Sequence, residues 1–422
     1  MYKKTVLDNG LEVITNRFPD AHSLSFGFWI KTGGRYETPK NQGISHFMEH
    51  MLFKGTKNRS CQQIKQAIEE KGGAFNAFTS EECVCYYVKI LSQQSSLACD
   101  VLSDMVLNSV FKEEEIEKER KVIFEELRMY LDLPMQYVHD LLDQLLWPEH
   151  PLGLPLVGTY ETVSAITRKD LNAQKDIFYA PNNIFAVACG NIDHDKFTAM
   201  LKKIFNEKKP VKQPEFKKAP GSKGARQVNF FHKETEQTHL CLGLKGLSRK
   251  HPLRYGLALL NIVLGGNMSS RLFNEIREKR SLAYEIGSSV KSYSDTGSFY
   301  IHAGIDNKKL KQAVSIMKRE LDKARRFLVS KRELNMAKEY FKSGLLMALE
   351  STMSNMLFLG EQSTTTGKIN TKDQILNAIE KVDANTIREV ATKLFDPKAL
   401  KLAVIGPQTD KEKLDIEGLL AS

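Results

Sequence analysis

Hydrophobic and polar positions alternate near the start of the chain, which predicts β-strands. From residue 24 to residue 30 every second side chain is hydrophobic, so we expect a strand with one buried and one exposed face. The residues of the buried face are Leu24, Phe26, Phe28 and Ile30. The first ten residues predict another strand that enters a turn at Asn9–Gly10, without the apolar run of a signal peptide. Strands and helical segments mix without regular βαβ alternation, so we expect an α+β fold with a largely antiparallel sheet.

Residues 44–53 predict an amphipathic helix. At about 100° per residue, one side collects apolar side chains, namely Ile44, Phe47, Met48, Met51 and Leu52. The opposite side collects His46, Glu49, His50 and Phe53. Two histidines four residues apart point their imidazoles at one place, where both can bind one ion while a neighbouring carboxylate reaches the ion's water. The pattern H-x-x-E-H is typical of an inverted zinc-peptidase helix, which needs a further protein ligand from elsewhere in the chain.

Residues 113–132 predict one long charged helix. Its apolar positions are Ile116, Ile123, Leu127 and Tyr130. Glu119 and Glu126 lie seven residues apart and therefore share a face, although most acids on such a helix are solvated partners of nearby lysine and arginine. The spacing alone leaves open which glutamate completes a metal site.

Two stretches of the chain share one pattern at a constant offset of 216 residues. The matching pairs are Ile166 with Val382, Leu171 with Ile387, Phe178 with Leu394, Pro181 with Pro397 and Gly190 with Gly406. An internal duplication is the simplest account. The position that corresponds to His50 is Gly266, so the metal motif occurs in the first copy alone.

Residues 208–226 are rich in proline, glycine and basic side chains, which is typical of a linker. We therefore expect an N-terminal domain over residues 1–207, which carries the metal motif, and a C-terminal domain over residues 227–422, which has no metal site. A chain of 422 residues is long enough for two cores, because single cores stop growing near ~250 residues.

Composition changes this picture little. With 41% hydrophobic and 27% charged residues, the chain reads as an ordinary globular protein, and no segment predicts a membrane span. The six cysteines show no framework spacing, so we expect reduced, mostly buried thiols. The net charge of +10 is compatible with binding to nucleic acid. However, the lysines are dispersed and no basic helix is interleaved with aromatic residues, which argues against such binding. We expect a cytoplasmic protein that binds neither nucleic acid nor membrane.

These features resemble the M16 family of metallopeptidases, the group of mitochondrial processing peptidase and insulin-degrading enzyme, and especially its bacterial processing-peptidase-like members. The resemblance extends along the whole chain and includes Gly55 and Thr56 after the metal motif and residues 151–153 before Gly158. It implies two homologous α+β domains, each a mostly antiparallel sheet packed by helices, that face each other around a chamber. It also implies one Zn²⁺ per chain and a homodimer.

The resemblance further implies roles at the metal site, in the N-terminal catalytic domain. The zinc ligands would be His46, His50 and Glu126. Glu49 would be the general base, which takes a proton from water and delivers it to the leaving amine. Glu119 would orient a ligand from behind it, without binding the metal.

Substrate contacts are implied in both halves. Residues 74–80 resemble the edge strand to which a peptide is added as an extra strand, and the contacts expected in the first half are Phe53, Asn76, Ala77 and Asp140. In the second half, Arg277 and Tyr284 would donate to the substrate carbonyl as an oxyanion develops. The implied function is a zinc-dependent endopeptidase that hydrolyses unstructured peptides or short protein segments. A catalytically silent scaffold or peptide-binding subunit is the alternative.

Overall fold

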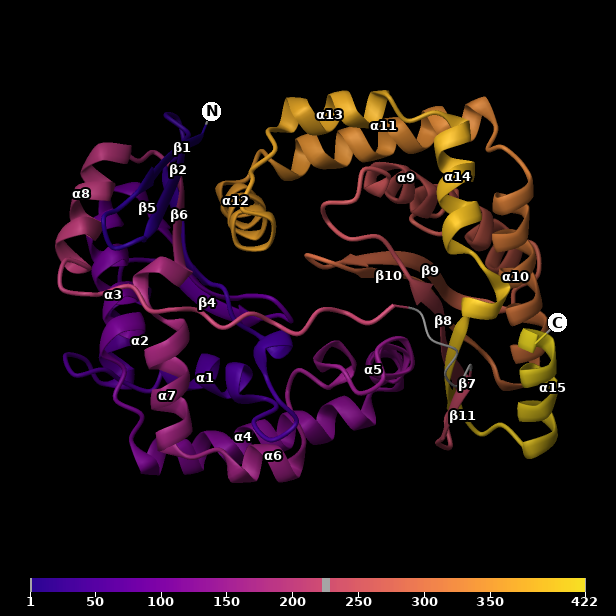
Figure 1. The fold of residues 1–422 in the computed structure, drawn as a ribbon, viewed down its shortest axis with the longest axis horizontal. Helices are drawn as coiled ribbons and strands as arrows, with labels where there is room; N and C mark the ends of the chain where they lie inside the picture. Colours follow the sequence, from indigo (N-terminus) through magenta and orange to yellow (C-terminus); the bar gives the residue numbers. More distant parts are fainter. Residues whose placement is uncertain (1, 222–227, 422) are drawn as a thin grey trace. The chain divides into compact units, whose positions relative to one another are not determined.

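The computed structural model describes residues 2–221 and 228–421, and Figure 1 labels most of its helices and strands. The chain forms two compact units, each assembled from three separate stretches. Unit 1 comprises Met1–Arg128, Leu154–Lys217 and Met347–Ile369. Unit 2 comprises Met129–Gly153, Lys218–Leu346 and Asn370–Ser422.

Unit 1 is built on a six-stranded sheet with the order β1-β2-β6-β3-β5-β4. Its strands are β1 (Tyr2–Val6), β2 (Glu12–Arg17), β3 (Ser23–Ile30), β4 (Ala74–Thr79), β5 (Val84–Leu91) and β6 (Ile184–Gly190). The β2–β6 pair is parallel, and the other pairs of this described sheet are antiparallel, as expected. The predicted N-terminal hairpin is confirmed as β1 and β2, where Gly10 takes a φ of 88° that suits glycine.

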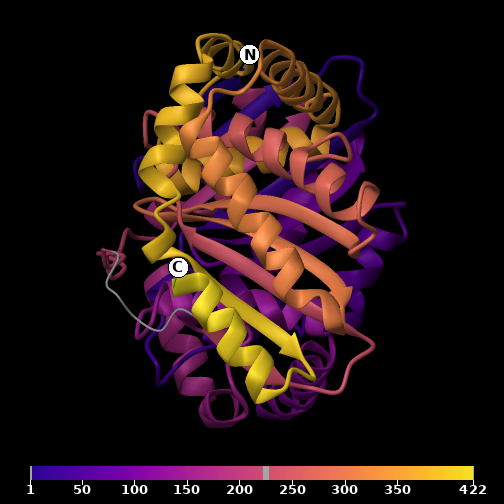
Figure 2. The same ribbon diagram turned by 90° about the vertical axis from the view of Figure 1, so that its right-hand side faces the viewer.

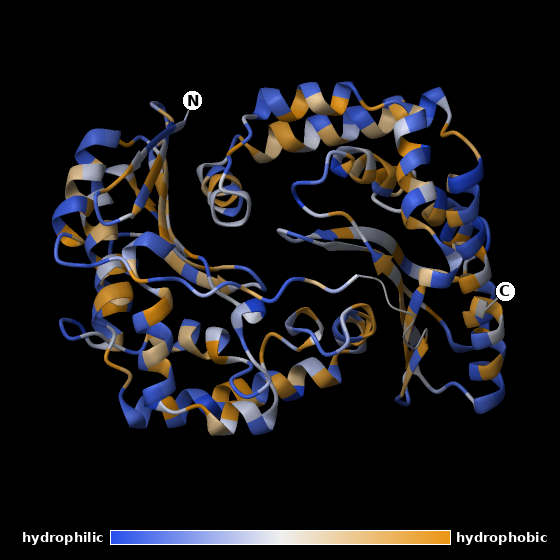
Figure 3. Cartoon of the chain, viewed as in Figure 1, coloured by the Kyte–Doolittle hydropathy of each residue, from blue (hydrophilic) through white to orange (hydrophobic). Residues whose placement is uncertain are grey.

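Helices pack on both faces of this sheet. The helices of unit 1 are α1 (Ile44–Leu52), α2 (Cys61–Glu69), α3 (Ser95–Asn108), α4 (Glu113–Asp132), α6 (Tyr160–Ala165), α7 (Arg168–Phe178), α8 (His194–Ile204) and α12 (Thr352–Thr366). Helix α4 has the ends predicted for the charged helix, and its last turn passes into unit 2. The main core lies between the sheet and α1, α3 and α8, and Figure 3 shows the strands of this sheet largely in orange.

Strand β3 was expected to have one exposed face, and this expectation is wrong. Ser25 and Trp29, which point away from the main core, are 0% and 2% exposed. They are covered by α12, where Thr352 Oγ1 lies 3.0 Å from Ser25 Oγ and Met356 Sδ accepts a hydrogen bond from Trp29 Nε1 at 3.3 Å. Because this helix is 327 residues away in sequence, local alternation carries no sign of it.

Unit 2 contains a five-stranded sheet with the order β7-β11-β8-β10-β9. Its strands are β7 (Val228–His232), β8 (Gln237–Lys245), β9 (Ala283–Ser292), β10 (Gly297–Asp306) and β11 (Lys401–Gly406). Its helices are α5 (Pro134–Leu146), α9 (Arg254–Leu264), α10 (Leu310–Arg326), α11 (Lys331–Ala348), α13 (Lys372–Glu380), α14 (Ala384–Leu394) and α15 (Asp410–Ala421). Figure 2 shows α10 and α15 in front of this sheet, and α5 packs on β8 and β11.

The two units repeat one topology, which supports the predicted duplication. The offset of 216 residues relates α7 to α14 with both ends in register and brings the start of α8 onto the start of α15. In both sheets the last strand of the copy, β6 or β11, lies between a parallel and an antiparallel neighbour. Unit 2 lacks an equivalent of β1 among its described strands.

The compact units differ from the predicted domains 1–207 and 227–422. Residues 129–153 of the first half belong to unit 2, and residues 347–369 of the second half belong to unit 1. These stretches contain α5 and α12, which overlap when α5 is shifted by the offset of the duplication. Equivalent helices are therefore exchanged, and each covers the sheet of the other half.

The predicted linker, residues 208–226, is described only in part. Residues 208–217 belong to unit 1, whereas residues 222–226 lie outside the described residues, as do residues 1, 227 and 422. The predicted placement of the two domains around a chamber stays a prediction.

Two expectations from composition can be compared with the described residues. All six cysteines are free, and five of them are buried, as expected for reduced thiols. No helix in the described part of the chain is both long and apolar enough to cross a membrane.

The contact between α12 and the sheet gives a test of the exchanged packing. At Gly360 an added Cβ would lie 2.0 Å from the Trp29 ring, so we expect Gly360→Ala to lower the free energy of unfolding by about 1–3 kcal/mol through overpacking. Gly344 in α11 is a matched control, because nothing lies within 4 Å of its added Cβ. Gly344→Ala should raise stability by up to ~1 kcal/mol. Urea unfolding followed by tryptophan fluorescence measures both, and equal behaviour of the two variants would contradict the packing.

Candidate metal centre

Helix α1 is held by its apolar face and by a carboxylate at its start. Its predicted apolar residues are all buried in the core of unit 1. The helix begins after Gly43, which has no side chain to cap it. Instead Glu37, which is 5% exposed, accepts hydrogen bonds from the N–H groups of Gly43 and Ser45, each at 2.8 Å. Burial raises the pKa of Glu37 although these hydrogen bonds oppose the rise, and the carboxylate faces the positive end of the helix dipole.

The predicted metal-binding side chains of unit 1 lie together. His46 and His50 come from α1 and Glu126 from α4, and one ligand atom from each lies within 4.8 Å of the others. Glu126 Oε2 is 3.6 Å from His46 Nε2 and 3.7 Å from His50 Nε2. Two ligands of a tetrahedral zinc ion, each about 2.0–2.1 Å from it, lie roughly 3.3 Å apart. The donor set is one that zinc binds, and both separations from Glu126 lie within about 0.4 Å of this value.

Glu119 lies behind His50 and does not belong to this group of ligand atoms. Its Oε2 is 3.1 Å from His50 Nδ1, and its Oε1 forms an ion pair with Lys54. Burial raises the pKa of Glu119, but the hydrogen bonds from His50 and Lys54 outweigh it, so the pKa lies below its ordinary value. An ionised Glu119 fixes His50 with Nε2 directed at the metal position, which is the arrangement expected for an orienting carboxylate.

His46 is the more buried of the two histidines. Burial, and then the neighbouring His50, lower the pKa of His46 to about 3. The imidazole is therefore neutral near pH 7, as a metal ligand must be. Its Nδ1 is buried and has no hydrogen-bond partner among the described residues, so no carboxylate supports it as Glu119 supports His50.

Glu49 of α1 contacts β4, the strand next to this helix. Its Oε2 accepts a hydrogen bond from Thr79 Oγ1 at 2.5 Å. Burial raises the pKa of Glu49, although Thr79 and His50 oppose the rise. Thr79 and Glu37 were not predicted from the sequence. Thr79 stands inside the segment 74–80 that the family resemblance singled out, whereas nothing in the pattern marked Glu37.

The predicted edge strand is β4, which lies at the end of the unit 1 sheet. Asn76 is exposed and accepts a hydrogen bond from the Ala77 N–H through its side chain at 2.8 Å. Phe53 follows α1 and packs its ring 5.4 Å from that of Phe75, measured between centroids. The three predicted contacts Phe53, Asn76 and Ala77 thus lie at or beside a strand with one unpaired edge among the described strands.

The predicted contacts Arg277, Tyr284 and Asp140 belong to unit 2. Arg277 lies in a π-helical segment, Phe273–Glu278, and Tyr284 near the start of β9 is 77% exposed. The Arg277 guanidinium lies 4.9 Å from the ring centroid of Phe273 and 5.1 Å from that of Tyr284. Asp140 lies on α5. Because the metal-binding side chains belong to unit 1, the joint action of these residues with the metal centre stays a prediction.

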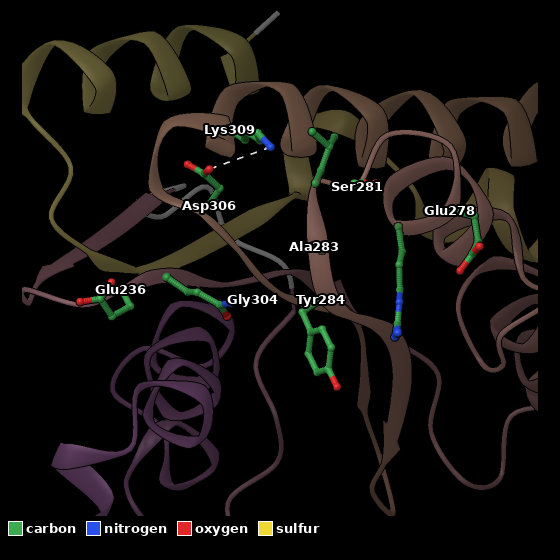
Figure 4. Close-up of a pocket in the computed structure, with 11 residues that line it drawn as sticks. Glu236, Glu278, Ser281, Ala283, Tyr284, Gly304, Asp306 and Lys309 are labelled. Atoms are coloured by element: carbon green, nitrogen blue, oxygen red, sulfur yellow. Dashed lines mark ion pairs between the residues drawn. The ribbon is translucent and has the colours of Figure 1, made fainter.

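Arg277 and Tyr284 line a pocket of about 620 Å³, shown in Figure 4. In that view the Tyr284 ring points away from the ribbon of β9, and the acidic side chains of Glu236, Glu278 and Asp306 surround the pocket. Asp306 is paired with Lys309 at 3.9 Å, whereas no ion pair of Arg277 occurs among the described residues. The guanidinium is therefore held by two aromatic rings, and its donors are available to a ligand.

Known proteins are similar to this chain along almost its whole length. A family profile described as "Insulinase (Peptidase family M16)" matches residues 12–160, and one described as "Peptidase M16 inactive domain" matches residues 165–341. The Bacillus subtilis protein "Uncharacterized zinc protease YmxG" is 39% identical over 96% of this chain and 98% of its own length. The chain belongs to the M16 peptidase family. A Streptomyces coelicolor member, "Uncharacterized zinc protease SCO5738", is 35% identical over 97% of this chain and 90% of its own length.

Solved structures of M16-like proteins confirm the predicted two-domain α+β fold. "The crystal structure of a protease from Helicobacter pylori" aligns with a TM-score of 0.90 at 23% identity, covering 96% of this chain and 99% of that one. An M16 inactive domain from Pseudomonas fluorescens aligns with a TM-score of 0.89 at 17% identity, covering 97% and 98%. At these identities the likeness concerns the fold alone.

The Glu37 cap provides a test of how the M16 metal helix is held. We expect Glu37→Ala to lower the free energy of unfolding by about 1–3 kcal/mol, because two buried N–H groups lose their acceptor. Glu37→Gln should lower the free energy of unfolding by less than Glu37→Ala does, since the amide oxygen still accepts one hydrogen bond. The control is Glu114→Ala in the exposed first turn of α4, which should change stability by less than about 0.5 kcal/mol. Chemical denaturation measures all three, and a wild-type value for Glu37→Ala would rule out the cap.

Proposed function

We propose that this M16 protein is a zinc-dependent endopeptidase that hydrolyses unstructured peptides or short protein segments. The observation that carries the proposal is the convergence of His46, His50 and Glu126, whose spacing fits one tetrahedral ion, with Glu49 on the same helix. Relatives at 39% and 35% identity bear the name zinc protease, which supports the same chemistry.

Different residues of unit 1 are proposed to have different roles in hydrolysis. Zinc, when bound, supplies a Lewis acid that polarises the scissile carbonyl and makes a water molecule more acidic. Glu49 takes a proton from the attacking water and later delivers it to the leaving amine. Glu49 lies on α1 between His46 and His50, so its carboxylate is on the side of the helix where this proton would be released. Glu119 keeps His50 in one orientation throughout.

Substrate binding is proposed to occur by strand addition at β4. A peptide that pairs with the free edge gains main-chain hydrogen bonds whatever its side chains, which accounts for tolerance of many sequences. Asn76 and Ala77 would contact such a peptide, and Phe53 would line its path. The proposal requires an extended, unfolded segment, because a folded domain cannot present a continuous strand backbone to the edge.

Arg277 and Tyr284 are proposed to donate hydrogen bonds to the carbonyl oxygen as negative charge develops on it. The absence of an ion-pair partner for Arg277 among the described residues and the exposed ring of Tyr284 support this role. Asp140 is proposed to contact the substrate. A homodimer, which the family resemblance implies, and a cytoplasmic location, which the sequence alone suggested, stay predictions.

The metal centre is tested with paired variants. We expect Glu49→Gln to bind one zinc per chain yet to lose roughly 10²–10⁴-fold in peptidase rate, because the proton acceptor is removed while the ligands remain. Glu126→Gln should lose zinc and activity together, whereas Glu125→Gln, its exposed neighbour on α4, should keep both. Metal analysis and cleavage of an unstructured peptide measure these outcomes.

Chelation should abolish cleavage by the wild type, and added zinc should restore it. A wild-type protein that binds zinc without cutting any peptide would favour the alternative, a silent scaffold or peptide-binding subunit. Full activity of Glu49→Gln would refute the assignment of the base.

The proposed donor pair is tested at Arg277. We expect Arg277→Lys to lower kcat roughly 10²-fold with little change in KM, because a point charge does not replace the directed N–H donors in the transition state. Lys279→Arg is the control, since Lys279 is an exposed residue of the following turn that pairs with Glu275. Steady-state kinetics on one peptide distinguish the two, and an equal loss in both variants would argue against a specific role.

A further inference from the structure

Thr79 connects the edge strand of unit 1 to the carboxylate of Glu49. It is the last residue of β4, and its hydroxyl donates to Glu49 Oε2 at 2.5 Å. This distance is at the short end of hydrogen bonds from hydroxyl groups to carboxylates, which are stronger than bonds between neutral groups. Among the described residues Glu49 has no other hydrogen-bond or ion-pair partner. One carboxylate oxygen is therefore held, and the other is left free to accept a proton.

The turn that follows Thr79 is fixed from two sides. Within the turn, the Ser80 N–H donates to the Cys83 carbonyl at 2.8 Å, and the Cys83 N–H donates to Ser80 Oγ at 3.1 Å. From outside, Arg35 forms a buried ion pair with Glu82 at 2.6 Å. Because a β-branched side chain has few χ1 rotamers, a fixed backbone also fixes the direction of the Thr79 hydroxyl.

The segment that holds this turn also holds the metal helix. Arg35 lies in the short 3₁₀ helix Gly34–Tyr36, and the next residue is Glu37, which caps the start of α1. The backbone N–H of Arg35 donates to the Glu81 carbonyl at 2.9 Å. Thr79 and Glu49 are thus presented by a strand and a helix that are both attached to one short segment.

We propose that Thr79 is a positioning residue that aligns Glu49 with the peptide paired to β4. This inference rests on the proposed function and deepens it. A peptide added to β4 takes its register from the backbone of that strand, and Glu49 is bonded to the same strand. The position of the general base and the position of the scissile bond are therefore both set by β4. Without the Thr79 hydroxyl the carboxylate rotates more freely, and a misplacement of about 1 Å can cost roughly 10²-fold in rate.

The test replaces the hydroxyl without changing the shape of the side chain. We expect Thr79→Val to lower kcat for an unstructured peptide roughly 10- to 100-fold, while KM stays within about twofold of the wild-type value. Zinc content and the midpoint of urea unfolding should equal those of the wild type. Thr79→Ser keeps the donor and should restore kcat to within about threefold. Thr198→Val is the matched control, because Thr198 of α8 is a half-buried threonine of unit 1 whose hydroxyl has no hydrogen-bond partner among the described residues.

Each outcome decides between the inference and its competitors. A wild-type kcat for Thr79→Val would overturn the inference while leaving the proposed peptidase intact. A fall in zinc content or unfolding midpoint in step with kcat, or failure of Thr79→Ser to recover, would also overturn it, because the role would then be structural. A wild-type protein without zinc-dependent cleavage would instead remove the proposed function, and the inference with it.

Discussion

The amphipathic geometry of α1 is the constraint on which the metal centre depends. Its apolar side chains are buried against the sheet of unit 1, so any rotation of the helix about its axis would expose them to water. This burial directs His46, Glu49 and His50 to the opposite side, and Glu37 fixes the position of the first turn. Hydrophobic packing therefore sets the direction of these three side chains, and the candidate metal centre is preorganised by the core.

Electrostatics distinguishes the two glutamates that share a face of α4. Glu119 is hydrogen-bonded to His50 and paired with Lys54, and both interactions keep its pKa below the ordinary value despite burial. Burial raises the pKa of Glu126 although His50 opposes the rise, and the carboxylate lies beside the Nε2 atoms of His46 and His50. A bound cation would reverse that rise, because it stabilises the carboxylate form. The same helix face thus carries one acid that is hydrogen-bonded to His50 and one acid whose burial favours a positive partner.

Much of the fold could be predicted from local sequence patterns, and the omissions have physical causes. The ends of α4 and the buried face of α1 follow from periodicity within a single helix. The choice of Glu126 over Glu119 came from family resemblance, because spacing on one helix face cannot reveal which acid meets another element. The second buried face of β3, the Glu37 cap and the Thr79 contact were missed because each depends on a partner distant in sequence or on another element. The exchange of α5 and α12 was missed for the same reason.

That exchange has a consequence for how such a chain can have arisen. Reciprocal swapping of equivalent elements is the arrangement of a domain-swapped homodimer, and here the partners are two copies within one polypeptide. A fusion of two such genes would convert a concentration-dependent association into an intramolecular one. Each half then depends on the other to close one apolar sheet surface, so the second copy could lose its ligands by mutation and still be retained by selection, as the partner that completes the first.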